Sequence, residues 1–239
     1  MNNYNNSLSE DTQSALPSRK TQRIEVAVFL FLVMPSLVLS HFVMKVHLIN
    51  FKLVVASLIL QNLSLLSLVL FFVWRNGESR IRIGWDFSQG CSEVALGALL
   101  FFPVFFGTSA LGAALKNLGF SAPAESLPAF LMPNNLPEYL LAILLVTIIA
   151  VVEETIFRGY LILRFKTITK NLPALVALST VIFALGHGYQ GWTGLVMVMV
   201  MGIILALVYI WRKSLVAPMV IHFLQNFIAI VVVPIVQKG

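Results

Sequence analysis

Apolar residues fill seven long runs of this chain, and short polar segments separate the runs. A helix needs about 20 apolar residues to cross the hydrocarbon core of a bilayer, and every run except the fifth comes close to that length. We therefore predict an all-α fold, a polytopic transmembrane helical bundle of about seven spans, or eight if a further short helix is present. The runs are Val26–Val43, Leu53–Trp74, Val94–Leu115, Tyr139–Leu161, Ala174–Leu185, Leu195–Trp211 and Val216–Val236.

Composition supports a membrane protein. The 239 residues are 59% hydrophobic and 11% charged, whereas soluble domains average about 25% charged residues. We therefore expect a lipid bilayer around the chain and no soluble second domain. The net charge of +6 is interpreted as a sign of topology, because Lys and Arg collect in cytoplasmic loops, and no nucleic-acid partner is expected. Cys91 is the single cysteine, which excludes an internal disulfide and a cysteine-cluster metal site.

Three regions follow from this pattern. Residues 1–24 are rich in Asn and Ser and are expected to form a disordered cytoplasmic tail. Residues 25–138 would form N-terminal transmembrane helices, and residues 139–239 catalytic ones within the same membrane domain. Most of the 16 Lys and Arg residues fall on one side if the N-terminus is inside and the C-terminus outside. We expect a multi-pass protein of a bacterial cytoplasmic membrane.

The segment "VVEETIFRGY" places three charges inside the fourth apolar run. Each such charge costs roughly 2.5–3.5 kcal/mol on insertion scales, so it persists where it is paired or functional. On a helix, Glu154 and Arg158 are four residues apart and share a face, so they can pair. Glu153 lies about 100° around the helix from Glu154. It therefore needs partners on other helices.

Two further polar clusters lie in apolar helices. The segment "FALGH" ends at His187, and "HFLQN" places His222 and Asn226 on one face. These two histidines lie near what the pattern indicates are the only buried carboxylates. At 1.5 Å per residue, Glu153 and His222 would both lie about 10 Å from the cytoplasmic face. His187 would lie about 20 Å deep, so the fifth helix would have to be tilted or recessed.

A carboxylate, two imidazoles and an amide contain no strong nucleophile, so water is the expected attacker. Glu153 would act as the general base, and His187 would share the water and shuttle its proton. His222 and Asn226 would donate hydrogen bonds to the oxyanion of a tetrahedral intermediate. Glu154 and Arg158 would be structural supports. We predict hydrolysis of a peptide bond, without metal or cofactor, in a cavity open to the cytoplasm and on a hydrophobic or membrane-presented peptide.

The three motifs resemble those of a known family. "EETIFR" matches EExxxR, "FALGH" matches FxxxH, and "HFLQN" matches HxxxN of the CAAX protease and bacteriocin-processing (Abi) family, the type II CAAX prenyl endopeptidases. The resemblance covers about residues 139–236. It implies a glutamate-dependent intramembrane endopeptidase, in which Glu153 and His187 activate water and His222 and Asn226 bind the oxyanion. It also implies possible roles in peptide maturation or bacteriocin immunity.

Alternative mechanisms remain open. A zinc protease could use Glu153, His187 and His222, since three such ligands plus water form a catalytic zinc pattern, although no HExxH is present and Asn226 would be idle. A rhomboid-like serine protease could pair Ser109 with His222. A proton-relay transporter, or an immunity or scaffold protein without turnover, would also place Glu and His in the membrane. Aspartyl proteolysis is excluded because Asp11 and Asp86 lie outside the spans.

Overall fold

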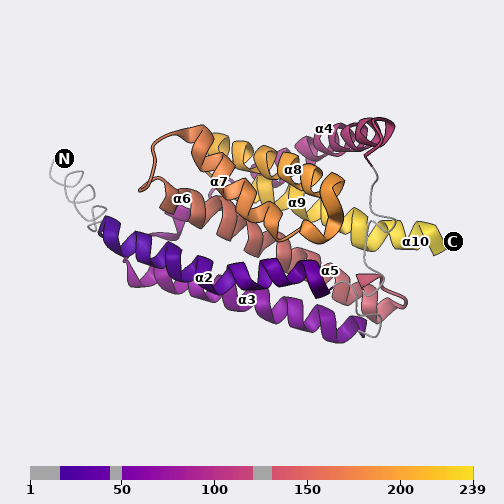
Figure 1. The fold of residues 1–239 in the computed structure, drawn as a ribbon, viewed down its shortest axis with the longest axis horizontal. Coiled ribbons are helices and arrows are strands. Elements are labelled where there is room, and N and C mark those ends of the chain that lie inside the picture. The colour runs from indigo at the N-terminus through magenta and orange to yellow at the C-terminus, as the bar shows by residue number, and fades with distance from the viewer. Residues whose placement is uncertain (1–16, 44–49, 121–130, 239) are drawn as a thin grey trace.

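The computed structural model describes residues 17–43, 50–120 and 131–238, and these residues form helices without strands. The predicted all-α helical bundle is confirmed, and Figure 1 shows most of its helices running along the long axis of the molecule. The helices are α2 (Arg19–Val43), α3 (Phe51–Arg75), η1 (Arg80–Ile83), α4 (Gly90–Asn117), α5 (Leu136–Glu153), η3 (Glu154–Leu161), α6 (Ile162–Phe165), α7 (Leu172–Leu185), η4 (Gly188–Gln190), α8 (Gly191–Arg212), α9 (Val216–Phe227), η5 (Ile228–Val232) and α10 (Val233–Lys238).

Each predicted apolar run forms a helix or a continuous series of helical segments. Five of the described helices are long and apolar enough to cross a membrane, and α7 is a shorter apolar helix. The protein is therefore a multi-pass membrane protein, while the count of seven spans stays a prediction. The five are Phe51–Arg75, Gly90–Asn117, Leu136–Phe165, Gly188–Arg212 and Val216–Gln237.

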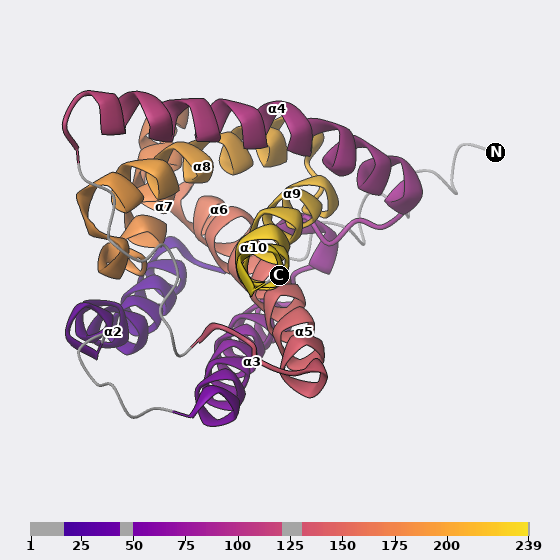
Figure 2. The same cartoon turned by 90° about the vertical axis from the view of Figure 1, so that its right-hand side faces the viewer.

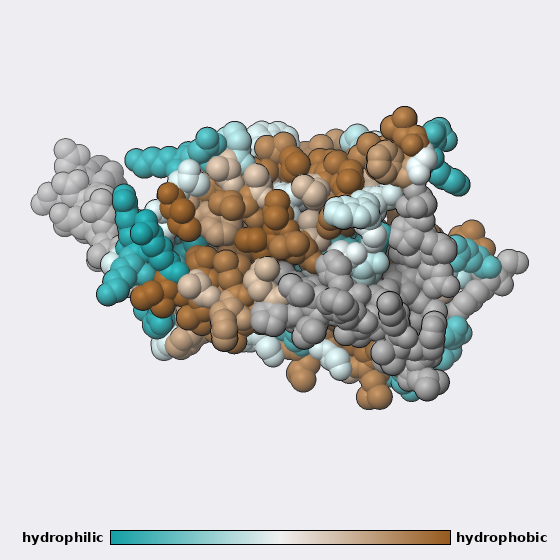
Figure 3. Space-filling model, viewed as in Figure 1, coloured by the Kyte–Doolittle hydropathy of each residue, from teal (hydrophilic) through white to brown (hydrophobic). Residues whose placement is uncertain are grey.

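The two ends of the described chain lie far apart. Helix α2 begins at one end of the bundle and α10 ends at the other (Figure 1), as an odd number of crossings would require. Helix α2 begins at Arg19, so the last residues of the predicted disordered tail, 1–24, are helical, and residues 1–16 lie outside the described part. Figure 3 shows hydrophilic side chains gathered where α2 begins and apolar surface along the middle of the bundle.

Helix α4 crosses over α8 and α9 on one side of the bundle (Figure 2). The close approach of α4 to α9 depends on Gly97. A Cβ atom at this position would lie 2.8 Å from the carbonyl oxygen of Ala217 and 2.8 Å from Cβ of Val220, so a larger residue would push the helices apart. Small residues at helix crossings are the usual means of close packing in membranes.

A group of charged side chains, most of them buried, lies near the basic end of the bundle, apart from the predicted site. Arg164 is fully buried, and its Nη1 donates to Glu78 Oε1 at 3.0 Å. Its Nε lies 3.4 Å from Glu25 Oε2, and Arg75 pairs with the other oxygen of Glu25. This charge cluster, Glu25, Arg75, Glu78 and Arg164, joins α2 and α3 to α6.

The charge cluster corrects one prediction. Of the two glutamates expected to be the only buried carboxylates, Glu154 is buried and Glu153 is partly exposed, and Glu25, Glu78 and Glu93 are also buried. The sequence pattern placed these three outside the apolar runs, where solvent was expected. Arg164, three residues after the fourth apolar run, is a buried partner of two of these glutamates. Glu93 likewise pairs with Arg212 at 2.6 Å.

The segment between α3 and α4 contacts both the start of α9 and the helix that carries the glutamates, and it holds the two together. Gly84 has a positive φ of +85°, and its carbonyl oxygen accepts a hydrogen bond from Leu215 N at 2.9 Å. Trp85 Nε1 donates to Thr155 Oγ1 at 2.9 Å. Gly159 lies so close to the Ile83 carbonyl oxygen that no side chain would fit there. Helix α9 therefore begins inside the protein.

Candidate active site

The helix that carries the glutamate pair changes geometry at the motif. Helix α5 continues directly into the π-helix η3 from Glu154 to Leu161, and all residues of η3 are buried. Thr155 Oγ1 donates back to the Val151 carbonyl oxygen at 2.6 Å, across this change. Wider π turns within α-helices are frequent at functional sites. The sequence prediction assumed a regular α-helix here and missed the π-helix, for which apolar periodicity gives no signal.

Glu154 and Arg158 form the predicted pair. Arg158 Nη1 donates to Glu154 Oε1 at 2.7 Å, and both side chains are buried. The guanidinium also lies over the ring of Phe183, 4.2 Å from its centroid, and Nη2 is 3.4 Å from the Gly202 carbonyl oxygen. The first residue of the "FALGH" motif thus covers the arginine of "EETIFR". A cation over an aromatic face in a desolvated site is stabilised by about 2 kcal/mol.

His222 contacts both glutamates. Its Nδ1 lies 2.8 Å from Glu154 Oε1, and its Nε2 lies 3.7 Å from Glu153 Oε2. The sequence predicted a partner on the same helix for Glu154 and partners on other helices for Glu153, and this description was incomplete. Glu153 has a neighbour on another helix, as predicted. Glu154 was expected to be satisfied by Arg158 alone, but it also fixes the ring of His222.

His187 joins this group from the end of α7. Its Nδ1 lies 3.1 Å from the Phe183 carbonyl oxygen, and the two rings are 4.8 Å apart. The Phe183 ring also meets His222 edge-on at 6.0 Å. Phe183 therefore contacts both imidazoles, and Glu153 and His222 lie within electrostatic range of His187.

The depths predicted for Glu153 and His187 stay predictions. The helix of Glu153 continues to Phe165, beyond the predicted end of the fourth apolar run. Helix α9 begins inside the protein, since Leu215 and Val216 at its start are already buried.

Asn226 lies one turn after His222 on the same face of α9. Its side chain is half-buried and makes no hydrogen bond within the described part of the chain. Several buried atoms nearby also lack a hydrogen-bond partner there, namely Glu153 Oε2, Glu154 Oε2 and Arg158 Nε. Buried polar atoms are normally paired with protein or water. The site is thus suited to bind water and a polar group of a substrate.

The zinc alternative requires three ligands grouped around one point. Within the described residues, no three His, Cys, Asp or Glu side chains are grouped so that they could hold a metal ion together. Glu153, His187 and His222 do not form such a group.

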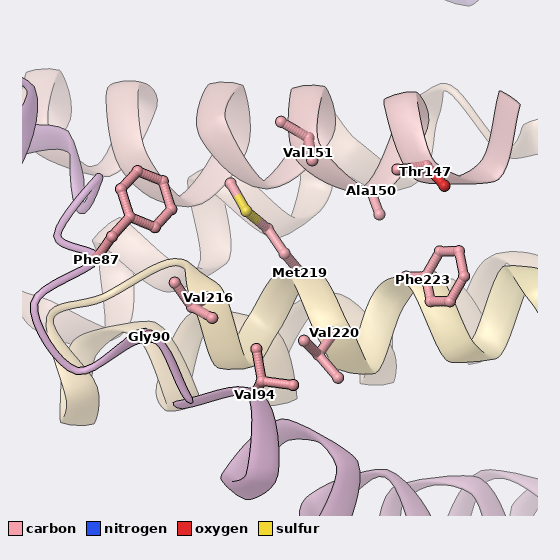
Figure 4. Close-up of a pocket in the computed structure, with 10 residues that line it drawn as sticks. All are labelled: Phe87, Gly90, Val94, Thr147, Ala150, Val151, Val216, Met219, Val220 and Phe223. Atoms are coloured by element: carbon pink, nitrogen blue, oxygen red, sulfur yellow. The ribbon is translucent and has the colours of Figure 1, made fainter. Parts of the chain in front are cut away.

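An apolar crevice lies between α5 and α9, beside the start of α4 (Figure 4). Its volume is about 330 Å³. Its lining contains none of the predicted catalytic residues. On α5, the crevice is lined by Thr147, Ala150 and Val151, which lie within two turns before Glu154. The lining residues are Phe87, Gly90, Val94, Thr147, Ala150, Val151, Val216, Met219, Val220 and Phe223.

Sequence reasoning missed one aromatic residue of the site. Tyr189 stacks on His187, with ring centroids 6.1 Å apart and an interplanar angle of 29°. Tyr189 lies in the segment "GHGYQGWTG", whose glycines interrupt the helical pattern. The spacing of Tyr189 two residues after His187 gives no helical signal, because the chain turns here through η4.

Comparison with known proteins supports the predicted resemblance. Residues 135–228 match the family model described as type II CAAX prenyl endopeptidase Rce1-like. The match includes all three motifs and the helices α5 to α9. No curated protein and no solved structure matches the chain.

Proposed function

We propose, from the match of residues 135–228 to the type II CAAX prenyl endopeptidases, that this chain hydrolyses a peptide bond with water activated by Glu153 and His187. The family supports a membrane endopeptidase. The observation that carries the mechanism is the placement of His222 between the two glutamates, 2.8 Å from Glu154 and 3.7 Å from Glu153.

Glu153 is the base of the proposed reaction because it is the glutamate without a fixed partner. Glu154 Oε1 is bound by both Arg158 and His222. Glu153 Oε2 has no hydrogen bond among the described residues, and the side chain is 20% exposed, so water can reach it. Glu153 takes a proton from that water while the oxygen of the water attacks the carbonyl carbon of the peptide bond. His187 then helps to pass the proton to the leaving amine.

His222 and Asn226 stabilise the oxyanion in this proposal. Nδ1 of His222 lies 2.8 Å from Glu154 Oε1, so Nε2 is the ring nitrogen left to donate to the oxyanion. The amide of Asn226 is the second donor and has no competing bond within the described chain. Loss of one such donor typically slows a reaction by about 10²–10³.

The proposed substrate is a hydrophobic or membrane-presented peptide, and the proposed location is a bacterial cytoplasmic membrane. A role in peptide maturation or bacteriocin immunity is compatible with the family. The test is cleavage of prenylated and unprenylated CAAX-type peptides by purified protein in detergent. Glu153→Gln should remove turnover, while the control Glu138→Gln, at the other end of the same helix, should keep it. Equal activity of all three proteins would refute the general-base assignment.

A further inference from the structure

Gly202 lies in α8, where both α7 and η3 pack against that helix. A Cβ atom at this position would lie 3.0 Å from Thr180 Cγ2, 3.3 Å from Phe183 Cδ1 and 3.5 Å from Arg158 Nη2. The first two distances are shorter than the optimal separation of about 3.5–4.0 Å between carbon atoms. The space beside Gly202 is therefore filled by two side chains of α7 and by the arginine of the Glu154–Arg158 pair.

The groups around this glycine have little room to move away from it. Thr180 is 2% exposed, and its β-branched side chain is restricted at χ1. The Phe183 ring is enclosed by the Arg158 guanidinium, 4.2 Å from its centroid, and by the Phe157 ring at 5.2 Å. Helix α7 is itself tied to η3, because Ser179 Oγ donates to the Phe157 carbonyl oxygen at 2.6 Å. An added methyl group would therefore displace these side chains or α8 itself.

Arg158 connects Gly202 to the proposed oxyanion donor. Its Nη2 lies 3.4 Å from the Gly202 carbonyl oxygen, while its Nη1 donates to Glu154 Oε1 at 2.7 Å. The same carboxylate oxygen lies 2.8 Å from Nδ1 of His222. The Phe183 ring, which meets the His222 ring edge-on at 6.0 Å, provides a second route. A displacement at Gly202 would therefore reach His222 along both routes.

We propose that Gly202 is a positioning residue of the active site. Because Gly202 has no side chain, Arg158 fits between Glu154 and the backbone of α8, and it keeps Glu154 where that carboxylate holds the ring of His222. This proposal rests on the proposed function, in which His222 donates to the oxyanion. Misplacement of a reacting group by about 1 Å can slow a reaction about 10²-fold. Because the oxyanion forms only in the transition state, the loss should appear in kcat and leave KM unchanged.

The test begins with Gly202→Ala, which should lower kcat about 10- to 100-fold at unchanged KM. The double variant Gly202→Ala with Thr180→Ser should recover a large part of this loss. Serine keeps the hydroxyl but lacks the Cγ2 methyl that the new Cβ atom would meet at 3.0 Å. Thr180→Ser alone is the reference for the double variant. The matched control is Gly112→Ala, which should keep wild-type kinetics, because a Cβ atom there would lie at the ordinary distance of 3.7 Å from Met197 Cε, also in α8.

The position of the His222 ring is measured independently of activity by NMR of ¹⁵N-histidine-labelled protein in detergent, with the His222 signals assigned from His222→Asn. These signals should shift in Gly202→Ala, return toward the wild-type values in the double variant, and stay unchanged in Gly112→Ala. Wild-type kcat together with wild-type His222 signals in Gly202→Ala would overturn the proposal. A lower folded yield with wild-type kcat per folded molecule would overturn it as well, because Gly202 would then act on packing alone.

Two further outcomes are decided by the same measurements. If Gly202→Ala yields no folded protein, the double variant is compared with Thr180→Ser, and equal kcat with equal His222 signals would overturn the proposal. If the wild-type protein cleaves no peptide, the proposed function fails, and the His222 signals alone decide whether Gly202 positions this ring.

Discussion

Glu154 Oε1 lies 2.8 Å from His222 Nδ1 and 2.7 Å from Arg158 Nη1. One carboxylate oxygen is therefore bound by two basic groups, one from its own helix and one from α9. A buried carboxylate with two such partners is held in one position by them. This relationship makes Glu154 the residue that orients His222, and it leaves Glu153 available for water.

Replacement of the two glutamates should separate these roles. Glu153→Gln is expected to reduce kcat by at least about 10³, since the general base is lost, while the yield of folded protein stays near that of the wild type. Glu154→Gln should reduce both kcat and the yield of folded protein, because Arg158 and His222 lose a charged partner. The measurements are peptide turnover and monodisperse yield after detergent extraction. A Glu153→Gln enzyme with wild-type turnover would end the assignment of the base.

Arg158→Ala should act mainly on stability. It leaves Glu154 buried with His222 as its remaining partner and removes the cation from the face of Phe183. Breaking a buried ion pair typically costs about 3–5 kcal/mol. Thermal unfolding in detergent should show a clearly lower unfolding temperature for Arg158→Ala. Arg80→Ala, at an exposed position, is the control. Unchanged unfolding of Arg158→Ala would contradict the pairing.

The charge cluster of Glu25, Arg75, Glu78 and Arg164 should also be structural. Arg164→Met would leave Glu78 without the partner that binds both of its oxygens. We expect a loss of about 3–5 kcal/mol and weaker association of α2 and α3 with the catalytic helices. The double variant Arg164→Met with Glu78→Leu removes both charges and should recover part of the loss, because replacing a buried ion pair by apolar residues is often neutral. If the double variant recovers no stability, the Arg164–Glu78 pair is not the source of the stability lost in Arg164→Met.

The helices and the site pairing could be predicted because they depend on local patterns. Apolar runs set the positions of the helices, and the four-residue spacing of Glu154 and Arg158 gave their ion pair. Other features depend on contacts between distant segments. The burial of Glu25 and Glu78 comes from Arg164, which is far away in sequence and belongs to another helix. The contact of His222 with Glu154 likewise required the depth of α9, which Gly84 and Leu215 set.

Chelation is a direct test of the zinc alternative. Activity should survive dialysis against EDTA, because a carboxylate and imidazoles can activate water without a metal. His222→Ala should lower kcat by about 10²–10³ without changing the metal content of the purified protein. Metal content is measured by elemental analysis before and after dialysis. Stoichiometric zinc, together with activity restored by zinc alone, would favour the metal mechanism.

The last prediction concerns the side from which substrate enters. By the positive-inside rule, we expect the basic residues near the start of α2 and the end of α8 to lie on the cytoplasmic side, and the cavity to open there. Arg158 cannot serve as a labelling position, although it lies in the motif, because it is fully buried. Lys170 and Lys116 are exposed at opposite ends of the bundle and are suitable instead.

Single cysteines at these two positions, on a Cys91→Ser background, would be treated with a membrane-impermeant thiol reagent in intact cells. Lys116→Cys should be labelled, whereas Lys170→Cys should react only after the membrane is permeabilised. Cys91→Ser alone provides the control for background labelling. The reverse pattern would invert the topology, and a cavity at the level of Glu153 would then have to receive its water and its substrate from the outer side.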